Sequence, residues 1–207
     1  MTSIDNYYKI NEILLESKTP SKEIIRLIKE GKLDEQPFDL IKKLSEIDQN
    51  RKYHPEGNVL NHVLLVVDEA AKNKNHSKNK EVFMWAALLH DMGKLTTTKL
   101  RKGRLTSYNH DVEGEKIAYD ILDKLGKDED FKVKVSKLVR YHMQPLFFDK
   151  NLPFFDPSNM LKECDYEEVA LLSKCDRLGR GELNESKIKE ECDRIENFKN
   201  YCKKVSD

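Results

Sequence analysis

The stretch that decides the fold is EVFMWAALLHDMGK, residues 81–94. It carries no charge from Val82 to Leu89, and a helix that is apolar on every side is typical of a buried core. His90 and Asp91 follow directly, and no Lys or Arg lies within one helical turn upstream of them. A carboxylate at the edge of such a helix is costly unless a cation neutralises it. We therefore expect a bound metal ion at this end of the helix.

The remainder of the chain shows helical spacing of apolar residues on both sides of this stretch, and Gly and Pro are scarce. A short hairpin or loop is expected about Gly103, directly after the quoted segment. The predicted fold class is therefore all-α. The predicted helices lie near residues 3–17, 21–30, 37–48, 59–71, 82–89, 110–125, 129–144, 158–163, 166–178 and 186–204.

The pattern divides the chain into three regions. Residues 1–50 form a helical arm with no obvious chemistry, called the N-terminal arm below. Residues 51–182 contain the apolar helix and the polar residues that follow it, so we expect them to form the functional domain. Residues 183–207 form an amphipathic helix that is expected to pack on this domain, and packing on a second copy is the alternative.

Composition excludes several classes of protein. The 207 residues include 37 basic and 37 acidic side chains, so there is no net charge to serve as a nucleic-acid coat. No run of about 18 apolar residues predicts a membrane span, and the N-terminus lacks the order of a signal peptide. We expect a cytoplasmic protein with reduced thiols. None of the cysteines forms a C-x-x-C pair of the zinc-binding kind: Cys164, Cys175, Cys192 and Cys202.

Further polar residues occupy the core-facing side of separate predicted helices: His62, His110, His142 and Asp176. A single histidine on an apolar face is more often a hydrogen-bonded core residue than a ligand. Four histidines and two aspartates turned inward on five helices are instead what a two-ion site needs, because neutral imidazoles bind borderline metals and a carboxylate bridges ions. His54 and His76 fail this test, since one lies in a turn and the other in a polar loop.

Together these residues resemble the HD domain superfamily of metal-dependent phosphohydrolases. The order His62, His90-Asp91, Asp176 matches its signature, and HDMGK at 90–94 matches its HDxGK form. The segments HPEGNVLNH, AALLHDMGK, NHDVEGEK, VRYH and CDRLGRG look like the HD domain attached to bacterial CCA-adding tRNA nucleotidyltransferases, over roughly residues 50–182. The paired strand carboxylates of the nucleotidyltransferase half are absent, so no nucleotide-adding activity is expected. The segment after the motif also lacks the acidic residues of the (p)ppGpp hydrolase branch.

The resemblance implies an HD-domain helical bundle with one or two divalent ions, of Mn, Fe, Co, Ni, Zn or Mg. One ion would be held by His62, His90, Asp91 and Asp176, and a second by Asp91, His110 and His142. The implied reaction is attack of metal-activated water on a phosphoester. A nucleotide or RNA-end phosphate, such as a 2′,3′-cyclic phosphate, is the implied substrate.

Basic residues near the motif are candidates for substrate contacts. Lys94 is expected to clamp a phosphate beside Asp91, and a solvated helix-end lysine is the alternative. Arg101 and Arg104 lie in a run from Lys94 to His110 that contains no acid, and we expect it to guide a phosphorylated substrate. Two further candidates follow the last aspartate of the signature: Arg177 and Arg180. In the HPEG segment, His54 and Glu56 either touch substrate or form an ordinary turn.

Two other functions compete with phosphohydrolysis. A binding or regulatory HD module with weak or no catalysis would carry no stoichiometric transition metal. A di-iron oxygenase of the same superfamily would hold iron and react with oxygen, and the basic run favours phosphate over this alternative. The oligomeric state is left open by the sequence.

Overall fold

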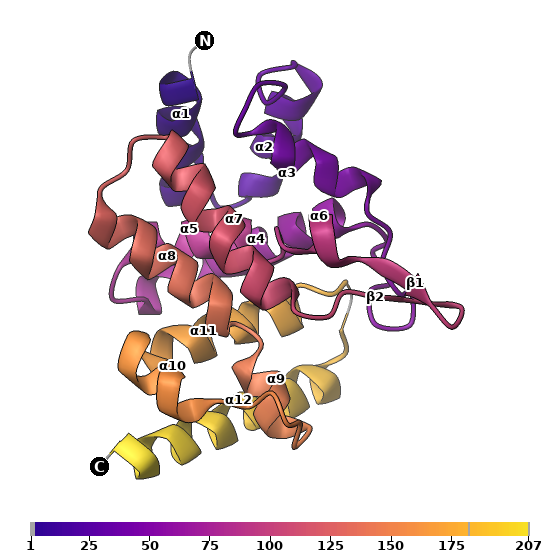
Figure 1. Cartoon of the computed structure of the whole chain (residues 1–207), viewed down its shortest axis with the longest axis vertical. Coiled ribbons are helices and arrows are strands. Elements are labelled where there is room, and N and C mark those ends of the chain that lie inside the picture. The colour runs from indigo at the N-terminus through magenta and orange to yellow at the C-terminus, as the bar shows by residue number, and fades with distance from the viewer. Residues whose placement is uncertain (1–2, 182, 207) are drawn as a thin grey trace.

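The computed structural model describes residues 3–181 and 183–206, and within them the chain is helical apart from one hairpin (Figure 1). The predicted all-α class is confirmed. The hairpin pairs β1 (Lys99–Arg101) with antiparallel β2 (Arg104–Thr106). No helix in these described ranges is long and apolar enough to cross a membrane. The helices are α1 (Ser3–Glu16), α2 (Pro20–Lys29), α3 (Asp39–Lys43), η1 (Leu44–Glu46), α4 (Val59–Asn73), η2 (Lys74–His76), α5 (Lys80–Leu89), α6 (Lys94–Thr97), α7 (His110–Lys124), α8 (Glu129–Tyr141), α9 (Gln144–Asp149), α10 (Pro157–Glu163), α11 (Tyr166–Leu178) and α12 (Glu185–Ser206).

Helix α5 forms the centre of the core. Each residue from Val82 to Leu89 is at most 5% exposed, because α1, α4, α8 and α11 all pack against this helix. The helix begins at Asn79, whose side chain accepts a hydrogen bond from the amide of Val82. Since α5 is enclosed on all sides, its C-terminal end lies inside the molecule and places His90 there.

The N-terminal arm packs on this central helix. The ring of Tyr7 stacks on Trp85 with centroids 5.0 Å apart, and Trp85 Nε1 donates a hydrogen bond to Asn11 Oδ1 at 2.8 Å. Figure 1 shows α1, α2 and α3 gathered at one end of the molecule, above α5. The arm therefore completes the core at that end.

Helix α12 closes the opposite end of the molecule (Figure 1). It packs on α11 and α9 and buries Ile195, Phe198 and Cys202. Packing on the body of the protein is thus what the structure shows. The expected boundary at residue 182 and the last residue of the expected helix, 207, lie outside the described residues.

Several element boundaries differ from the expectations. The expected helix over 37–48 is divided into α3 and η1, and it ends where Ile47 adopts an extended backbone. Helix α9 was not predicted as a separate element. It begins after Met143, with Pro145 in its first turn; proline has no amide hydrogen and cannot continue a preceding helix. The expected hairpin is present, and its turn uses positive φ at Lys102 and Gly103.

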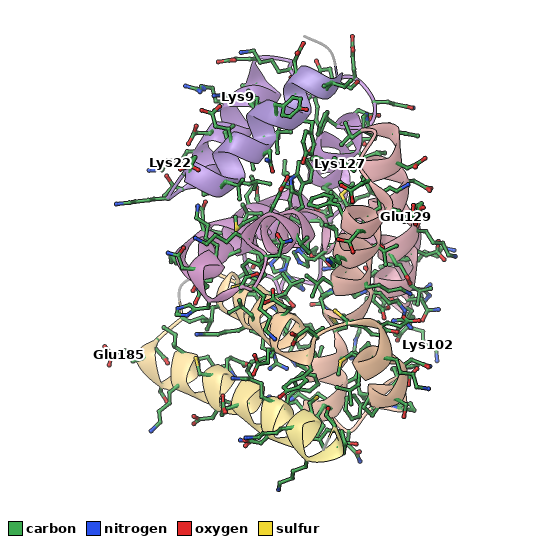
Figure 2. The ribbon with its side chains drawn as sticks, turned by 90° about the vertical axis from the view of Figure 1, so that its left-hand side faces the viewer. Lys9, Lys22, Lys102, Lys127, Glu129 and Glu185 are labelled. Atoms are coloured by element: carbon green, nitrogen blue, oxygen red, sulfur yellow. The ribbon has the colours of Figure 1, made fainter. Side chains whose placement is uncertain are left out.

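Charged side chains cover the outside of the bundle. Figure 2 shows Lys9, Lys22, Lys102 and Glu185 pointing away from the ribbon. Charged residues make up 36% of the sequence, compared with about 25% in an average globular protein. The buried charges are few by comparison, and one group of them, which includes Asp91, Lys94 and Asp176, lies around the end of α5.

Candidate metal centre

Five helices bring the predicted ligands together at the end of α5. Their ligand atoms form two groups that share Asp91, and within each group these atoms all lie within 4.8 Å of one another. One group is His62, His90 and Asp91, and the other is Asp91, His110 and His142. Asp176 joins the first group, because its Oδ1 lies 3.0 Å from His62 Nε2. All six residues are buried, at most 9% exposed.

Two glycines allow the helices to approach this closely. A Cβ at Gly93 would lie 1.9 Å from the carbonyl oxygen of His110, so only glycine fits between the end of α5 and the start of α7. Gly114 on α7 lies against Val139, where an added Cβ would come within 3.1 Å. The glycines therefore set the distance between the helices that carry His90 and His110.

Three imidazoles share one arrangement that fixes which nitrogen faces the centre. The Nδ1 atoms of His90, His110 and His142 lie 2.8, 2.8 and 2.6 Å from the carbonyl oxygens three residues earlier. A carbonyl only accepts, so each Nδ1 carries the proton and donates it. Each Nε2 is then left with a lone pair directed inward, which is the usual state of a metal-binding histidine.

Two of these lone pairs have no partner among the described residues. His90 Nε2 and His142 Nε2 are buried and accept no hydrogen bond. Leaving a buried polar atom unpaired costs free energy. These two imidazoles are therefore better explained as metal ligands than as hydrogen-bonded core histidines. The donor set of nitrogen and carboxylate oxygen fits a borderline divalent ion.

Burial keeps part of the histidine set neutral. It lowers the pKa of His142 to about 3, with the neighbouring His90 adding to the effect, and it lowers the pKa of His110 in the same direction. Burial also lowers the pKa of His62, but contacts with Asp176 and Glu56 outweigh it and raise the pKa overall. A metal ion therefore competes with a proton mainly at His62, since only neutral imidazole binds metal.

Both ligand carboxylates are ionised and each is paired with a cation. Burial alone would raise the pKa of Asp91, but Lys94 holds it well below its usual range. Arg180 does the same for the pKa of Asp176, and its Nη2 donates to both carboxylate oxygens at 3.0 and 3.1 Å. The charges of the two ligand carboxylates are thus balanced by those of two cations.

Lys94 is a buried part of the centre. Its Nζ donates to Asp91 Oδ2 at 2.6 Å and to Gln49 Oε1 at 2.7 Å, and the residue is only 7% exposed. The alternative of a solvated helix-end lysine is therefore wrong. The cation that pairs with Asp91 comes one helical turn downstream of it, whereas the turn upstream offers none.

The other predicted substrate residues lie in two different places. Arg101 is held by its own hairpin: it donates to Thr106 and its guanidinium lies 5.0 Å from the centroid of the Tyr108 ring. Arg104 is exposed on β2. Arg177 is not brought to the ligand cluster. It is buried on α11 in an ion pair with Glu191 of α12, so its guanidinium is engaged in packing that helix and is unavailable to a substrate.

A scan against protein families agrees with the geometry. The model described as HD domain matches residues 59–196, which is more than half of the chain. The chain belongs to the HD domain family. This family consists generally of metal-dependent phosphohydrolases, and the paired His/Asp groups described above are suited to holding such a metal.

Curated relatives of this HD domain protein share the name Multifunctional CCA protein. The one from Actinobacillus pleuropneumoniae serotype 5b (strain L20) is 31% identical over 105 residues, covering 51% of this chain and 25% of the relative. The one from Azoarcus sp. (strain BH72) is 30% identical over 146 residues, covering 67% and 34%. The chain thus spans about a quarter to a third of the length of the curated relatives it matches. The expected similarity to CCA proteins is confirmed.

Sequence reasoning did not find Gln49, and it named His54 and Glu56 only as possible substrate contacts or an ordinary turn, without their contacts to His62. His54 contacts His62 ring to ring with centroids 4.7 Å apart, Glu56 Oε1 lies 2.8 Å from His62 Nδ1, and Gln49 binds Lys94. The test for inward-facing residues used helical periodicity, and these residues precede α4 in a loop. The available signal was position, because HPEG comes directly before the helix that carries His62. His76, which failed the same test, is exposed at the end of η2.

Proposed function

We propose that the protein is a metal-dependent phosphohydrolase acting on the phosphate of a nucleotide or an RNA end, such as a 2′,3′-cyclic phosphate. The observation that carries the proposal is the convergence of four buried imidazoles and two carboxylates, with unpaired Nε2 atoms directed at one centre. One or two ions of Mn, Fe, Co, Ni, Zn or Mg would be held by His62, His90, Asp91, His110, His142 and Asp176. The sharing of Asp91 between two ligand groups supports two ions.

The chain supplies a cation beside the proposed ions. A divalent ion, when bound, supplies Lewis acidity and a water acidified toward neutral pH. The ammonium group of Lys94 has three N–H donors, and Asp91 and Gln49 use two of them. The third donor is left for a phosphoryl oxygen, and such a charge-assisted bond is strong where water is excluded. Lys94 would thus hold the phosphate against Asp91.

Arg180 and the hairpin provide further positive charge. The side chain of Arg180 is 25% exposed although it is bound to Asp176, so it would meet a substrate at the edge of the centre. Arg101 and Arg104 lie in a stretch with no acid between Lys94 and His110. Attraction by such a stretch raises the rate of encounter with anions, which supports a phosphorylated substrate.

Exposed tyrosines beside the site support a substrate with a base. Tyr108 is 61% exposed and comes two residues before His110, and Tyr53 is 59% exposed and directly precedes His54. An aromatic face next to basic side chains suits stacking of an unpaired nucleobase. The name of the relatives, Multifunctional CCA protein, points to the same class of substrate. A cytoplasmic location stays a prediction.

A hydrolysis assay tests the proposal. The metal-stripped protein is supplied with Mn²⁺, Ni²⁺ or Co²⁺ and given 2′,3′-cyclic and linear 2′-, 3′- and 5′-nucleoside phosphates. We expect hydrolysis of at least one of them, and its loss in His90→Ala and Asp91→Ala. Activity that is absent across the panel, or that survives both substitutions, would overturn the proposal. Bound iron with an oxygen-dependent reaction would favour the di-iron alternative, and a chain without stoichiometric metal would favour the binding module.

A further inference from the structure

The loop before α4 places a carboxylate behind one of the proposed ligands. Glu56 Oε1 lies 2.8 Å from His62 Nδ1 and 2.9 Å from His54 Nδ1. The Glu56 side chain is only 4% exposed, and a carboxylate is seldom buried without a specific partner. The contact of Glu56 with these two histidines is therefore a specific part of the site.

His62 needs such a partner because of its place in its helix. The imidazoles of His90 and His142 donate to carbonyls in the last turns of α5 and α8, which have no partner within the helix, and His110 donates to the Ser107 carbonyl in the loop before α7. His62 is the fourth residue of α4, and there the carbonyls accept from the helix itself; the Asn58 carbonyl, for example, accepts from the His62 amide. A side chain from outside the helix has to take the Nδ1 proton, and Glu56 is placed to do so.

We propose that Glu56 is a positioning residue for the metal centre. Its Oε1 lies 2.8 Å from His62 Nδ1, although the present orientation makes no hydrogen bond, and it would accept the Nδ1 proton once Nε2 binds an ion. Without an ion, Nε2 carries a proton and donates it to Asp176 Oδ1 at 3.0 Å, and Asp91 Oδ2 lies 3.6 Å from the same nitrogen. His54 holds the same Glu56 oxygen from the other side. A carboxylate behind a ligating histidine fixes its tautomer and raises its basicity. This inference rests on the metal centre of the proposed function and concerns affinity for metal, not the reaction.

His54, Glu56 and His62 also form a third group with the spacing of metal ligands. In that arrangement Glu56 would be a ligand itself. The geometry favours positioning, because His62 directs its Nε2 at Asp176 and both Nδ1 atoms converge on one oxygen of Glu56. The two roles differ in the number of ions bound, which is measurable.

Calorimetric titration of the metal-stripped protein with Mn²⁺ and Co²⁺ tests the role of Glu56. Glu56→Gln keeps an acceptor but loses the charge, and Glu56→Ala loses both. We expect affinity to fall in that order, by about 10-fold and about 100-fold, with the number of ions unchanged. The Co²⁺ absorption spectrum should change as the His62 ring loses its fixed orientation.

A second buried carboxylate provides the matched control. Glu168 is 9% exposed and accepts from Ser77 Oγ and from the Lys78 amide, and it lies outside the ligand groups. Glu168→Gln should therefore leave metal affinity unchanged, even if it lowers the melting temperature. Circular dichroism of the metal-free proteins establishes that each variant folds, and Glu56→Gln, which is nearly the same size, decides the question if Glu56→Ala does not fold.

Two outcomes overturn the inference. One is metal affinity in folded Glu56 variants equal to that of the wild type. The other is a lower number of bound ions, which would make Glu56 a ligand. Absence of phosphohydrolase activity in the wild type would instead count against the proposed function and would leave the titration interpretable.

Discussion

At the scale of single residues, Lys94 makes the contact with the clearest consequence. It is buried against Asp91 with one N–H donor unused. Replacing Lys94 should therefore weaken the interaction with substrate and leave metal binding intact. We predict that Lys94→Met lowers kcat/KM by about 100-fold, the typical cost of removing one preorganised donor. Metal affinity should not fall, because removing a cation does not weaken attraction for another cation.

Steady-state kinetics and metal titration of Lys94→Met check this prediction. Lys22→Met is the control, since Lys22 is exposed on α2 and lies outside the basic stretch. Wild-type kinetics in Lys94→Met, or a loss of metal affinity, would contradict the role given to Lys94.

The same scale shows what the sequence reveals about a site. His62, His110 and Asp176 could be found because each lies on a helix, where periodicity tells which side faces inward. Glu56 and Gln49 lie in connections outside any helix, and no period reports the direction of a loop side chain. Arg177 was expected to contact substrate because it follows Asp176 in the sequence. Its side chain instead pairs with Glu191 of α12.

At the scale of elements, the proposed function assigns to the hairpin and the loop that follows it the discrimination of nucleotides from other phosphates. Tyr108 has Arg101 over its ring and is 61% exposed. We predict that Tyr108→Ala raises KM for nucleoside phosphates by about 5- to 150-fold, since a base stacked on an aromatic side chain contributes about 1–3 kcal/mol. Hydrolysis of a base-free ester such as glycerol phosphate should not change.

The control for Tyr108 is Tyr8→Ala, because Tyr8 is 66% exposed on α1, which lies at the far end of the molecule from the hairpin (Figure 1). Equal effects of Tyr108→Ala on both kinds of substrate would show that stacking is not the role of Tyr108.

The contact between α11 and α12 gives a prediction about stability. Glu191→Gln removes the partner of the buried Arg177 guanidinium, so the free energy of unfolding should fall by about 3 kcal/mol. Urea denaturation measures this change. Glu190→Gln, on the same helix with a side chain 46% exposed, should cost less than about 1 kcal/mol. If Glu191→Gln were as stable as the wild type, the ion pair would not hold α12.

Elements could be predicted from sequence wherever local chemistry decides them. Asp156 caps α10 and Pro157 begins it, as expected, because caps act within one turn. Helix α9 was missed since it has only six residues, too few to show a period. The extent of the helix expected at 37–48 was wrong because tertiary packing and the return of the chain at Ile47 end it early.

At the scale of the whole molecule, the helices surround a group of charged and polar residues and bury it. The chain has no net charge, and four buried imidazoles meet two buried carboxylates and the Lys94 ammonium where α5 ends. The N-terminal arm and α12 cover opposite ends of the bundle (Figure 1) and leave the ligand cluster between them. The all-α class followed from the sequence. The packing of the arm could not be predicted, because a stripe of apolar residues does not show which element it packs against.

The metal content of the purified protein shows whether the cluster at the end of α5 holds ions. Elemental analysis of the purified protein counts the ions per chain, with Asp91→Ala as the comparison, because Asp91 is shared by both ligand groups. We predict one or two divalent ions per wild-type chain and a large loss of bound metal in Asp91→Ala. A wild-type chain without stoichiometric metal, even after incubation with Mn²⁺, Co²⁺ or Ni²⁺, would contradict this prediction, and so would an unchanged metal content in Asp91→Ala.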